Sequence, residues 1–235
     1  MHLFKQHTAM KRLSLFFLCS VVVLSLQAQT EGDDFGGLIS TELSWKMAKR
    51  AQLSFEEELR TQQHFSKLER SSSTLDLSFK LSDHFKLGAA YNFIYQQYYR
   101  PKKDLWQWEI RQRYYTYATA SWDVNRFEIS LRERFQSTYR QSKDYKNPKN
   151  YLRSRISVDY DIRRSPFQPY ASAEMYYLLK SQESGINRWR YTAGCEYKID
   201  KKNQLDFFYR YTTFADDDND EENGHMLGLC FKHRF

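Results

Sequence analysis

The sequence predicts an all-β protein, a single antiparallel up-and-down transmembrane β-barrel of about 10–12 strands that follows a cleaved signal peptide. Three observations lead to this fold class. Apolar and polar residues alternate with a period of two through almost the whole chain after residue 36. The alternating runs approach the length of about 9–11 residues that a tilted membrane strand needs. Short polar turns also alternate with longer loops, as they do in outer-membrane barrels.

The composition fits one domain whose residues are sorted by face. The chain has 235 residues, and aromatic residues make up 17% of it, with 18 Tyr and 17 Phe but only 4 Pro. The mean hydropathy is −0.79, so the chain is polar on average. Aromatic side chains favour strands and interfaces where one side is apolar and the other is wet.

The first 28 residues read as a signal peptide. Lys11 and Arg12 precede an apolar run over 13–26, and Ala28 follows at the expected cleavage site. The run is shorter than the ~20 residues of a spanning helix. We therefore expect residues 1–28 to be removed and residues 29–235 to form the barrel.

The alternation defines eleven candidate strands. They contain residues 39–45, 53–59, 74–81, 85–95, 106–113, 127–134, 152–162, 171–179, 189–197, 205–211 and 227–235. Bacterial single-chain barrels have even strand numbers. Either one strand is missed, or the first segment lies outside the wall, because the first and last segments would both run towards the periplasm.

The connections fall into two classes. Tight polar turns are expected at 47–50, 82–84, 123–125, 163–166 and 200–203, and longer segments at 62–67, 98–104, 140–150, 180–186 and 215–224. This rhythm places the tight turns on the periplasmic side.

The apolar face of each strand is expected to meet lipid. Aromatic residues near strand ends would form the interfacial girdles, namely Trp45, Phe85, Trp106, Phe127, Trp189 and Phe214. Glu57 and Glu133 fall on this face by parity. A bulge or a position near the interface would reconcile them with it.

The opposite face carries charges of both signs and is expected to line the lumen. Its members are Glu56, Glu58, Arg60, Glu109, Arg111, Arg113, Arg132, Arg134, Arg153, Arg155, Asp159, Glu174, Arg188, Arg190, Glu196 and Arg210, with Glu128, Asp161 and Asp206 beside them. Arginine–carboxylate pairs satisfy one another, and the side chains of a small barrel already fill its interior. We interpret the lumen as a packed ionic network of a structural or accessory barrel. The alternative is a porin-like, narrow path for small ions or solutes.

No motif for catalysis, metal binding or a cofactor is found, and we expect none of these. A third alternative, a lipid-modifying enzyme, depends on His225 lying beside Ser181 or Ser184. The net charge of +7 is spread along an exported chain, which argues against nucleic acid. Cys195 and Cys230 would point to opposite faces of non-adjacent strands, so no disulfide is expected.

The acidic segment 216–222 reads as a solvated loop. Its alternating carboxylates leave open a Ca²⁺ site, although Glu221 stands where an EF-hand loop has glycine. A looser role, bridging divalent ions to anionic surface glycolipid, is also open.

The C-terminus carries a candidate assembly signal. Phe235 ends the chain, and Phe231 precedes it in a strand of alternating apolar residues. This pattern is similar to the terminal strand read by the barrel-assembly machinery of Gram-negative bacteria. The expected partners are that machinery during insertion and outer-membrane lipid and glycolipid afterwards. The oligomeric state is left open.

Four stretches together resemble a family of outer-membrane proteins known as domain of unknown function 2490. They are 53–60, 150–153, 169–174 and 190–197. The resemblance covers almost all of the chain after the signal peptide. It implies an outer-membrane location and a β-barrel, and it carries no catalytic residue.

Overall fold

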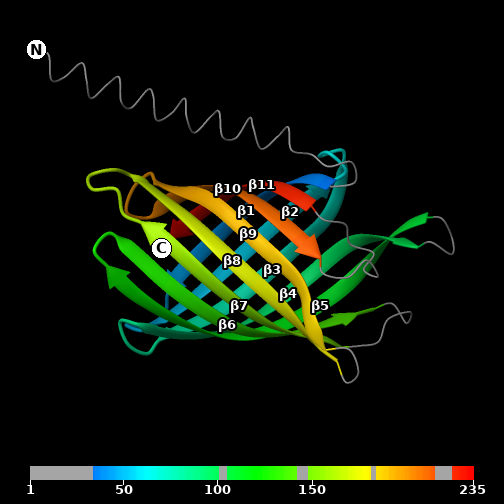
Figure 1. Ribbon diagram of the computed structural model, residues 1–235, viewed down its shortest axis with the longest axis horizontal. Helices are drawn as coiled ribbons and strands as arrows, with labels where there is room; N and C mark the ends of the chain where they lie inside the picture. Colours follow the sequence, from blue (N-terminus) through cyan, green and yellow to red (C-terminus); the bar gives the residue numbers. More distant parts are fainter. Residues whose placement is uncertain (1–33, 101–104, 142–147, 181–183, 215–223) are drawn as a thin grey trace, which may run out of the picture. The chain divides into compact units, whose positions relative to one another are not determined.

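The computed structural model describes residues 34–100, 105–141, 148–180, 184–214 and 224–235, and within them eleven strands close into one barrel (Figure 1). The strands are β1 (Asp34–Lys46), β2 (Ala51–Gln62), β3 (Lys67–Lys80), β4 (Phe85–Arg100), β5 (Leu105–Val124), β6 (Phe127–Arg140), β7 (Lys149–Tyr160), β8 (Phe167–Leu179), β9 (Gly185–Lys198), β10 (Asn203–Phe214) and β11 (Gly224–Arg234). No helix among these residues is long and apolar enough to span a membrane. The expected signal peptide, 1–28, and the acidic segment, 216–222, lie outside them.

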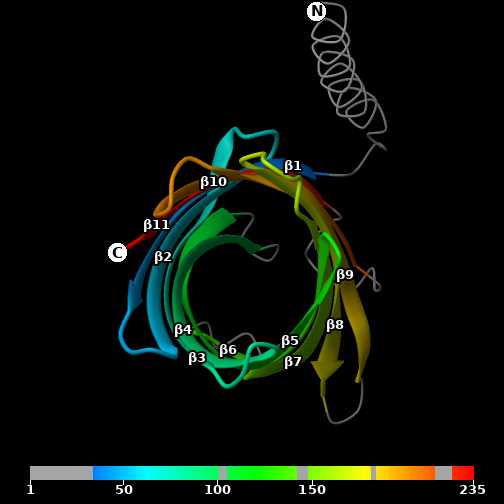
Figure 2. The same cartoon turned by 90° about the vertical axis from the view of Figure 1, so that its left-hand side faces the viewer.

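Neighbouring strands in sequence pair as antiparallel hairpins around the wall (Figure 2). Each alternating run of the sequence falls within one strand, apart from one or two residues at the ends of some runs. We call the end with the connections 47–50, 81–84, 125–126, 161–166 and 199–202 the turn end. The opposite end, with the connections 63–66, 101–104, 141–148, 180–184 and 215–223, is the loop end. The two classes of connection predicted from the sequence therefore lie at opposite ends of the barrel.

The barrel closes through a parallel pair. β1 and β11 pair in register from Asp34 opposite Gly224 to Ser44 opposite Arg234. Ten connections separate these strands, so both run from the loop end to the turn end, and they can pair only in parallel. The predicted number of about 10–12 strands is confirmed, whereas the expectation of wholly antiparallel pairing is wrong at this seam. No strand was missed among the described residues, and the first segment belongs to the wall.

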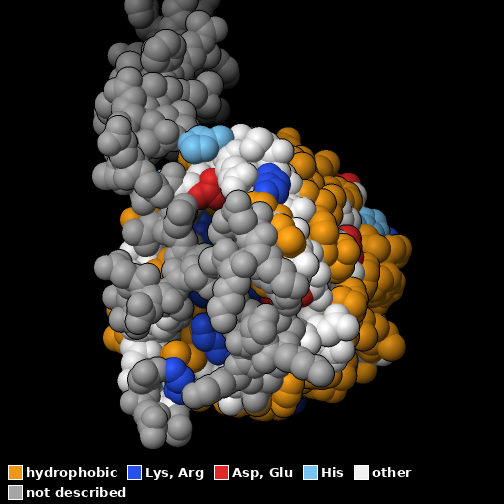
Figure 3. Space-filling view, turned by 90° about the vertical axis from the view of Figure 1, so that its right-hand side faces the viewer, with side chains coloured by type: hydrophobic (Ala, Val, Ile, Leu, Met, Phe, Trp, Pro, Cys, Tyr) orange, Lys and Arg blue, Asp and Glu red, His pale blue; other side chains and the backbone are white. Residues whose placement is uncertain are grey.

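Burial separates two faces on every strand. Ile39 is 63% exposed, whereas the adjacent Ser40 is 4% exposed. On β3 the exposed residues are Leu75, Leu77 and Phe79, and serine and threonine alternate with them. Figure 3 shows that apolar side chains cover much of the visible outer wall. Apolar side chains outside and polar ones inside invert the arrangement of a water-soluble protein, and this identifies a transmembrane barrel.

Two carboxylates lie on the outer face, and serine hydroxyls bind them. Ser71 and Ser73 of β3 donate to Glu57 over 3.1 and 2.5 Å, and Ser154 of β7 donates to Glu133 over 2.7 Å. The register of β2 and β3 shifts only at Arg60/Thr61, and both glutamates lie near the middle of their strands. The expected bulge or interfacial position is therefore wrong.

Most of the expected girdle residues are on the outer face. Trp45 stacks on Phe235 with ring centroids 5.1 Å apart, and Phe85, Trp106 and Phe127 are exposed. Phe214 is an exception. It pairs with Arg188 of β9, whose guanidinium lies 4.5 Å from its ring centre, and it therefore faces the lumen.

Aromatic rings lie on the inner face where the neighbouring strand has glycine. Tyr117 is opposite Gly88, and Phe208 is opposite Gly228. A Cβ atom at Gly228 would lie 2.0 Å from the Phe208 ring, and one at Gly88 would lie 2.3 Å from the Tyr117 ring. A residue without a side chain is needed at both positions, because the ring occupies that space.

Candidate functional site

The charged residues that the sequence assigns to the lumen lie on the face of each strand that carries the buried side chains. Asp161 is an exception, because β7 ends at Tyr160 and Asp161 is exposed in the turn that follows. Because the lumen gathers buried charges of both signs, we take it as the candidate site.

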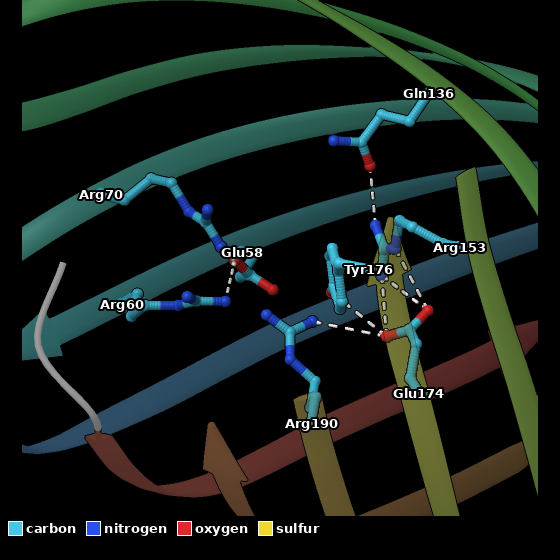
Figure 4. Close-up of polar contacts among 8 residues, drawn as sticks. All are labelled: Glu58, Arg60, Arg70, Gln136, Arg153, Glu174, Tyr176 and Arg190. Carbon is cyan, nitrogen blue, oxygen red and sulfur yellow. Dashed lines mark hydrogen bonds and ion pairs between the residues drawn. The ribbon is translucent and has the colours of Figure 1, made fainter. Parts of the chain in front are cut away.

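Arg153 of β7 is the centre of one group of contacts (Figure 4). Its Nη2 donates to both carboxylate oxygens of Glu174 over 2.8 and 2.9 Å, and its Nη1 donates to Gln136 over 2.7 Å. The Tyr176 hydroxyl donates to the same carboxylate over 3.1 Å. Arg153 and Glu174 are both buried. The contacts fix both charges and join β6, β7 and β8 across the inner wall.

The Tyr176 ring is also surrounded by guanidinium groups. Those of Arg153, Arg188 and Arg190 lie 4.2, 4.8 and 5.1 Å from the ring centre. The negative face of an aromatic ring attracts cations, and this attraction partly offsets the repulsion between arginines. A single tyrosine thus helps to hold three positive charges together.

A second group surrounds Glu58 of β2. Arg70 donates to its carboxylate over 2.6 Å, and Arg60 approaches it to 3.5 Å. The register shift after Arg60 brings Glu69 to this face, where its carboxylate lies 3.7 Å from Arg60 Nε. On β5, Glu109 and Arg111 form a buried ion pair.

Other arginines of the lumen have neutral partners. Arg113 donates to Thr138 over 3.3 Å. The Arg134 guanidinium lies 4.2 Å from the Tyr115 ring centre, and that of Arg210 lies 4.8 Å from the Phe208 ring centre. Among the described residues, none of these three arginines forms an ion pair with a carboxylate.

The contacts near the turn end centre on carboxylates. Lys232 is ion-paired with Glu196 and lies 3.4 Å from Asp206. The hydroxyl of Tyr170 donates to Asp206 over 3.1 Å, and that of Tyr117 donates to Asp76 over 2.9 Å.

Charge of the two signs is separated along the lumen. On five strands an arginine lies nearer the loop end and a carboxylate nearer the turn end, as in Arg70 and Asp76 (β3), Arg134 and Glu128 (β6), Arg153 and Asp159 (β7), Arg190 and Glu196 (β9), and Arg210 and Asp206 (β10). We call the first set, with its neighbours, the arginine zone: Arg60, Arg70, Arg111, Arg113, Arg134, Arg153, Arg155, Arg188, Arg190 and Arg210. The second set is the acidic zone: Glu42, Glu56, Asp76, Glu128, Asp159, Glu196 and Asp206.

The arginine zone is net positive. Among the described residues it contains the carboxylates Glu58, Glu69, Glu109 and Glu174, fewer than its arginines, and each of them lies within 4 Å of an arginine nitrogen. The acidic zone contains fewer bases than carboxylates, namely Lys86, Arg132 and Lys232. Figure 3 shows Lys and Arg side chains in the mouth at the loop end. The arrangement can attract anions into one half of the lumen and cations into the other.

The structure does not bring together His225 and Ser184, the two described residues of the enzyme alternative. The Tyr209 hydroxyl and His225 Nδ1 are 2.5 Å apart, and the ring of His225 stacks on that of Tyr211. Ser184 bonds to the backbone of Lys180, and Ser181 lies outside the described residues. Cys195 and Cys230 are free thiols.

The candidate assembly signal contacts β1 at the β1–β11 seam. Phe235 stacks on Trp45, and its backbone N–H donates to Ser44 of β1 over 2.9 Å. Phe231 lies opposite Thr41 of β1 and Leu205 of β10.

Sequence reasoning missed the inward aromatic rings. Tyr115, Tyr117, Tyr170, Tyr176 and Phe208 lie on the charged face, but the alternation assigned only polar residues to it. For Tyr117, Tyr170 and Phe208 the available signal was a glycine on the neighbouring strand, and its use requires the register between strands. Tyr115 and Tyr176 lie opposite residues other than glycine.

The family model for "protein of unknown function (DUF2490)" matches residues 35–223, which covers β1 to β10. The chain belongs to this family. No curated protein matches this DUF2490 protein.

Solved structures of membrane barrels are similar to this DUF2490 protein. The NanC porin has 16% identity and a TM-score of 0.51, with 85% of this chain and 98% of that chain covered. The KdgM porin, solved with disordered oligogalacturonate, has 12% identity and a TM-score of 0.44, with 77% and 90% covered. The β domain of the Bordetella autotransporter BrkA has 14% identity and a TM-score of 0.44, with 82% and 86% covered. At such identities the likeness to NanC concerns the fold alone.

Proposed function

We propose that this DUF2490 protein is a barrel of the Gram-negative outer membrane whose lumen is a narrow, anion-preferring path for small ions or solutes. In this proposal residues 1–28 direct export and are removed, and residues 29–235 form the barrel. The turn end faces the periplasm, as tight turns do in outer-membrane barrels.

The excess of arginine over carboxylate in the arginine zone carries the proposal. Field lines are focused inside a narrow lumen with low-dielectric walls, so an uncompensated positive charge raises the local anion concentration. Arginine remains charged at all physiological pH values, so this preference does not depend on protonation.

The test is conductance of the refolded chain in planar bilayers under a KCl gradient. We expect discrete channels whose reversal potential has the sign of chloride selectivity. The double variant Arg113→Gln/Arg134→Gln should move the reversal potential towards zero. Lys201→Gln, an exposed lysine of the β9–β10 turn, is the matched control and should leave it unchanged. Cation selectivity of the unaltered protein would refute the proposal.

A structural or accessory barrel with a packed lumen is the second candidate. It is favoured by the burial of Glu109, Arg111, Arg153 and Glu174, each 5–7% exposed. Side chains held in this way fill a small barrel. Complete absence of conductance from correctly inserted protein would select this candidate over the channel.

We also propose that the barrel-assembly machinery reads the strand from Phe231 to Phe235 during insertion, and that the finished wall contacts outer-membrane lipid and glycolipid. The support is the apolar outer face of β11, where Leu227 is exposed and Phe235 ends the strand pattern. Deletion of Phe235 should reduce insertion in cells. Insertion at the normal level would contradict this part of the proposal.

A further inference from the structure

Three arginines of the arginine zone flank the part of the lumen wall at the β1–β11 seam. Arg190 and Arg210 lie on β9 and β10, on one side of the seam, and Arg60 lies on β2, on the other. Four inward residues of the seam lie beside them, namely Leu38 opposite Arg60, Met226 opposite Arg210, and Gly228 and Gly36, which pair with those two. None of these four residues is charged.

Each of these three arginines has a buried donor without an acceptor. The Nε atoms of Arg60, Arg190 and Arg210 are fully enclosed and make no hydrogen bond to any described residue. A buried donor left unpaired costs on the order of 1–3 kcal/mol. Native structures rarely leave such groups unsatisfied. Arg134 and Arg155 of the arginine zone also have an unsatisfied Nε. The three at the seam differ in that they flank an uncharged stretch of wall.

Carboxylates of the chain do not neutralise the three charges. Arg60 shares Glu58 with Arg70 and Glu69 with Gln96. Arg190 Nη1 lies 3.8 Å from Glu174 Oε2, because Arg153 donates three hydrogen bonds to that carboxylate. Arg210 lies against the Phe208 ring, and Glu58, whose carboxylate is bonded to Arg70, attracts it at longer range. Arg210 also repels both Arg60, across the seam, and Arg190, on its own side of it.

Figure 4 shows how two of these side chains are directed. Arg60 and Arg190 extend from their strands into the lumen, with Glu58 and Glu174 as the carboxylates drawn beside them. Guanidinium groups present planar forks of N–H donors that match oxyanions such as phosphate and sulfate.

We propose that Arg60, Arg190 and Arg210 form a binding site for a compact oxyanion against the β1–β11 seam. The bound oxyanion accepts hydrogen bonds from guanidinium N–H groups and neutralises part of their mutual repulsion. The inference deepens the proposed function, since it names oxyanions as the class of anion that the lumen retains.

The test uses the full-length mature barrel in detergent, with inorganic sulfate and inorganic phosphate as probes. Sodium chloride at equal ionic strength is the reference for each. A ligand that binds only the folded state raises the apparent unfolding temperature with its concentration. We expect both oxyanions to do so, and we expect titration calorimetry to give saturable binding of one oxyanion per chain.

Arg60→Gln and Arg210→Gln should each weaken binding by about tenfold or more, because each removes charge-assisted hydrogen bonds. Arg132→Gln is the matched control. Arg132 also faces the lumen, but its Nε already donates to Thr119 over 3.0 Å. It should retain the response. Sulfate also stabilises folded proteins non-specifically, and such an effect would be equal in all variants. Equal responses, or none in the unaltered protein, would overturn the site.

The conservative variants Arg60→Lys and Arg210→Lys keep the charge and remove the Nε donor. They replace the glutamine variants in the binding measurement if those do not fold. They should bind more weakly than the unaltered protein.

The channel proposal and the oxyanion-site proposal can fail independently of each other. A barrel that binds sulfate but carries no current retains the site and loses the channel. One that conducts chloride selectively without an oxyanion response retains the channel and loses the site.

Discussion

Arg153 shows what one residue does in a lumen of this kind. It donates to Glu174 and Gln136 and lies against the Tyr176 ring, so residues of three strands meet at one guanidinium. Breaking a buried ion pair is costly mainly because the other charge is left behind, whereas replacing both partners costs much less.

We therefore expect Arg153→Met to destabilise the barrel by about 3 kcal/mol, because Glu174 loses its bidentate partner. The double variant Arg153→Met/Glu174→Leu should recover more than half of this loss. Urea unfolding in lipid vesicles, followed by tryptophan fluorescence, measures both. A double variant less stable than the single one would contradict the role given to this pair.

Glu57 is the corresponding residue on the outer face. Ser71 and Ser73 bind its carboxylate, and a charge facing lipid near mid-height is unfavourable without such donors.

For this residue, Glu57→Gln should leave stability unchanged or raise it slightly, because it removes the charge and keeps an acceptor. Ser71→Ala/Ser73→Ala should lower stability by about 1–3 kcal/mol, because the carboxylate loses its donors. The same unfolding assay applies. Equal changes in stability in Glu57→Gln and in the double serine variant would contradict the stabilising role given to Ser71 and Ser73.

The sequence predicts which charges share the inner face, because a period of two determines which face a side chain occupies. It does not predict their partners. Glu57 and Ser73 are 16 residues apart along the chain, and they meet only because β2 and β3 pair in one register. The residue type alone also does not show that Tyr176 points inward. Tyr176 and its neighbour Tyr177 are both tyrosines, and a tyrosine suits lipid as well as the lumen.

At the scale of elements, the hairpins follow from local signals and the closing pair does not. Each antiparallel pair joins consecutive strands, so the turns between them already indicate it. β1 and β11 are separated by the rest of the chain, and nothing local specifies their register. The even-number rule suggested a missed strand or a first segment outside the wall, and neither is found among the described residues.

The seam has a direct test because Cys230 lies on β11 opposite Ser40 of β1. Ser40→Cys, in a Cys195→Ser background, should form a disulfide with Cys230 under mild oxidation. The expected readout is a shift in gel mobility that a reductant reverses. Ile39→Cys is the matched control, since its side chain points to the opposite face and should not react with Cys230. Equal crosslinking of both variants would contradict the parallel register.

At the scale of the whole molecule, the separation of charge makes the lumen asymmetric. The arginine zone lies towards the loop end and the acidic zone towards the turn end. When the turn-end compartment is positive, anions are driven into the arginine zone and cations into the acidic zone, so both carriers accumulate. The opposite polarity depletes the lumen of both anions and cations.

Individual channels should therefore carry at least about twofold more current when the turn-end compartment is positive, at 100 mV in symmetric salt. Glu196→Gln/Asp206→Asn should reduce this asymmetry, because it removes charge from the acidic zone alone. A linear current–voltage relation in the unaltered protein would show that the separation of charge has no electrical consequence.

The central claim is a closed wall with charged residues inside and apolar residues against lipid. It is tested most directly by cysteine scanning of β7 from Arg153 to Val158, one position at a time, in vesicles and in a background free of other cysteines. A water-soluble thiol reagent should label positions 153, 155 and 157 and spare 154, 156 and 158. Uniform labelling, or a period near that of a helix, would contradict the account.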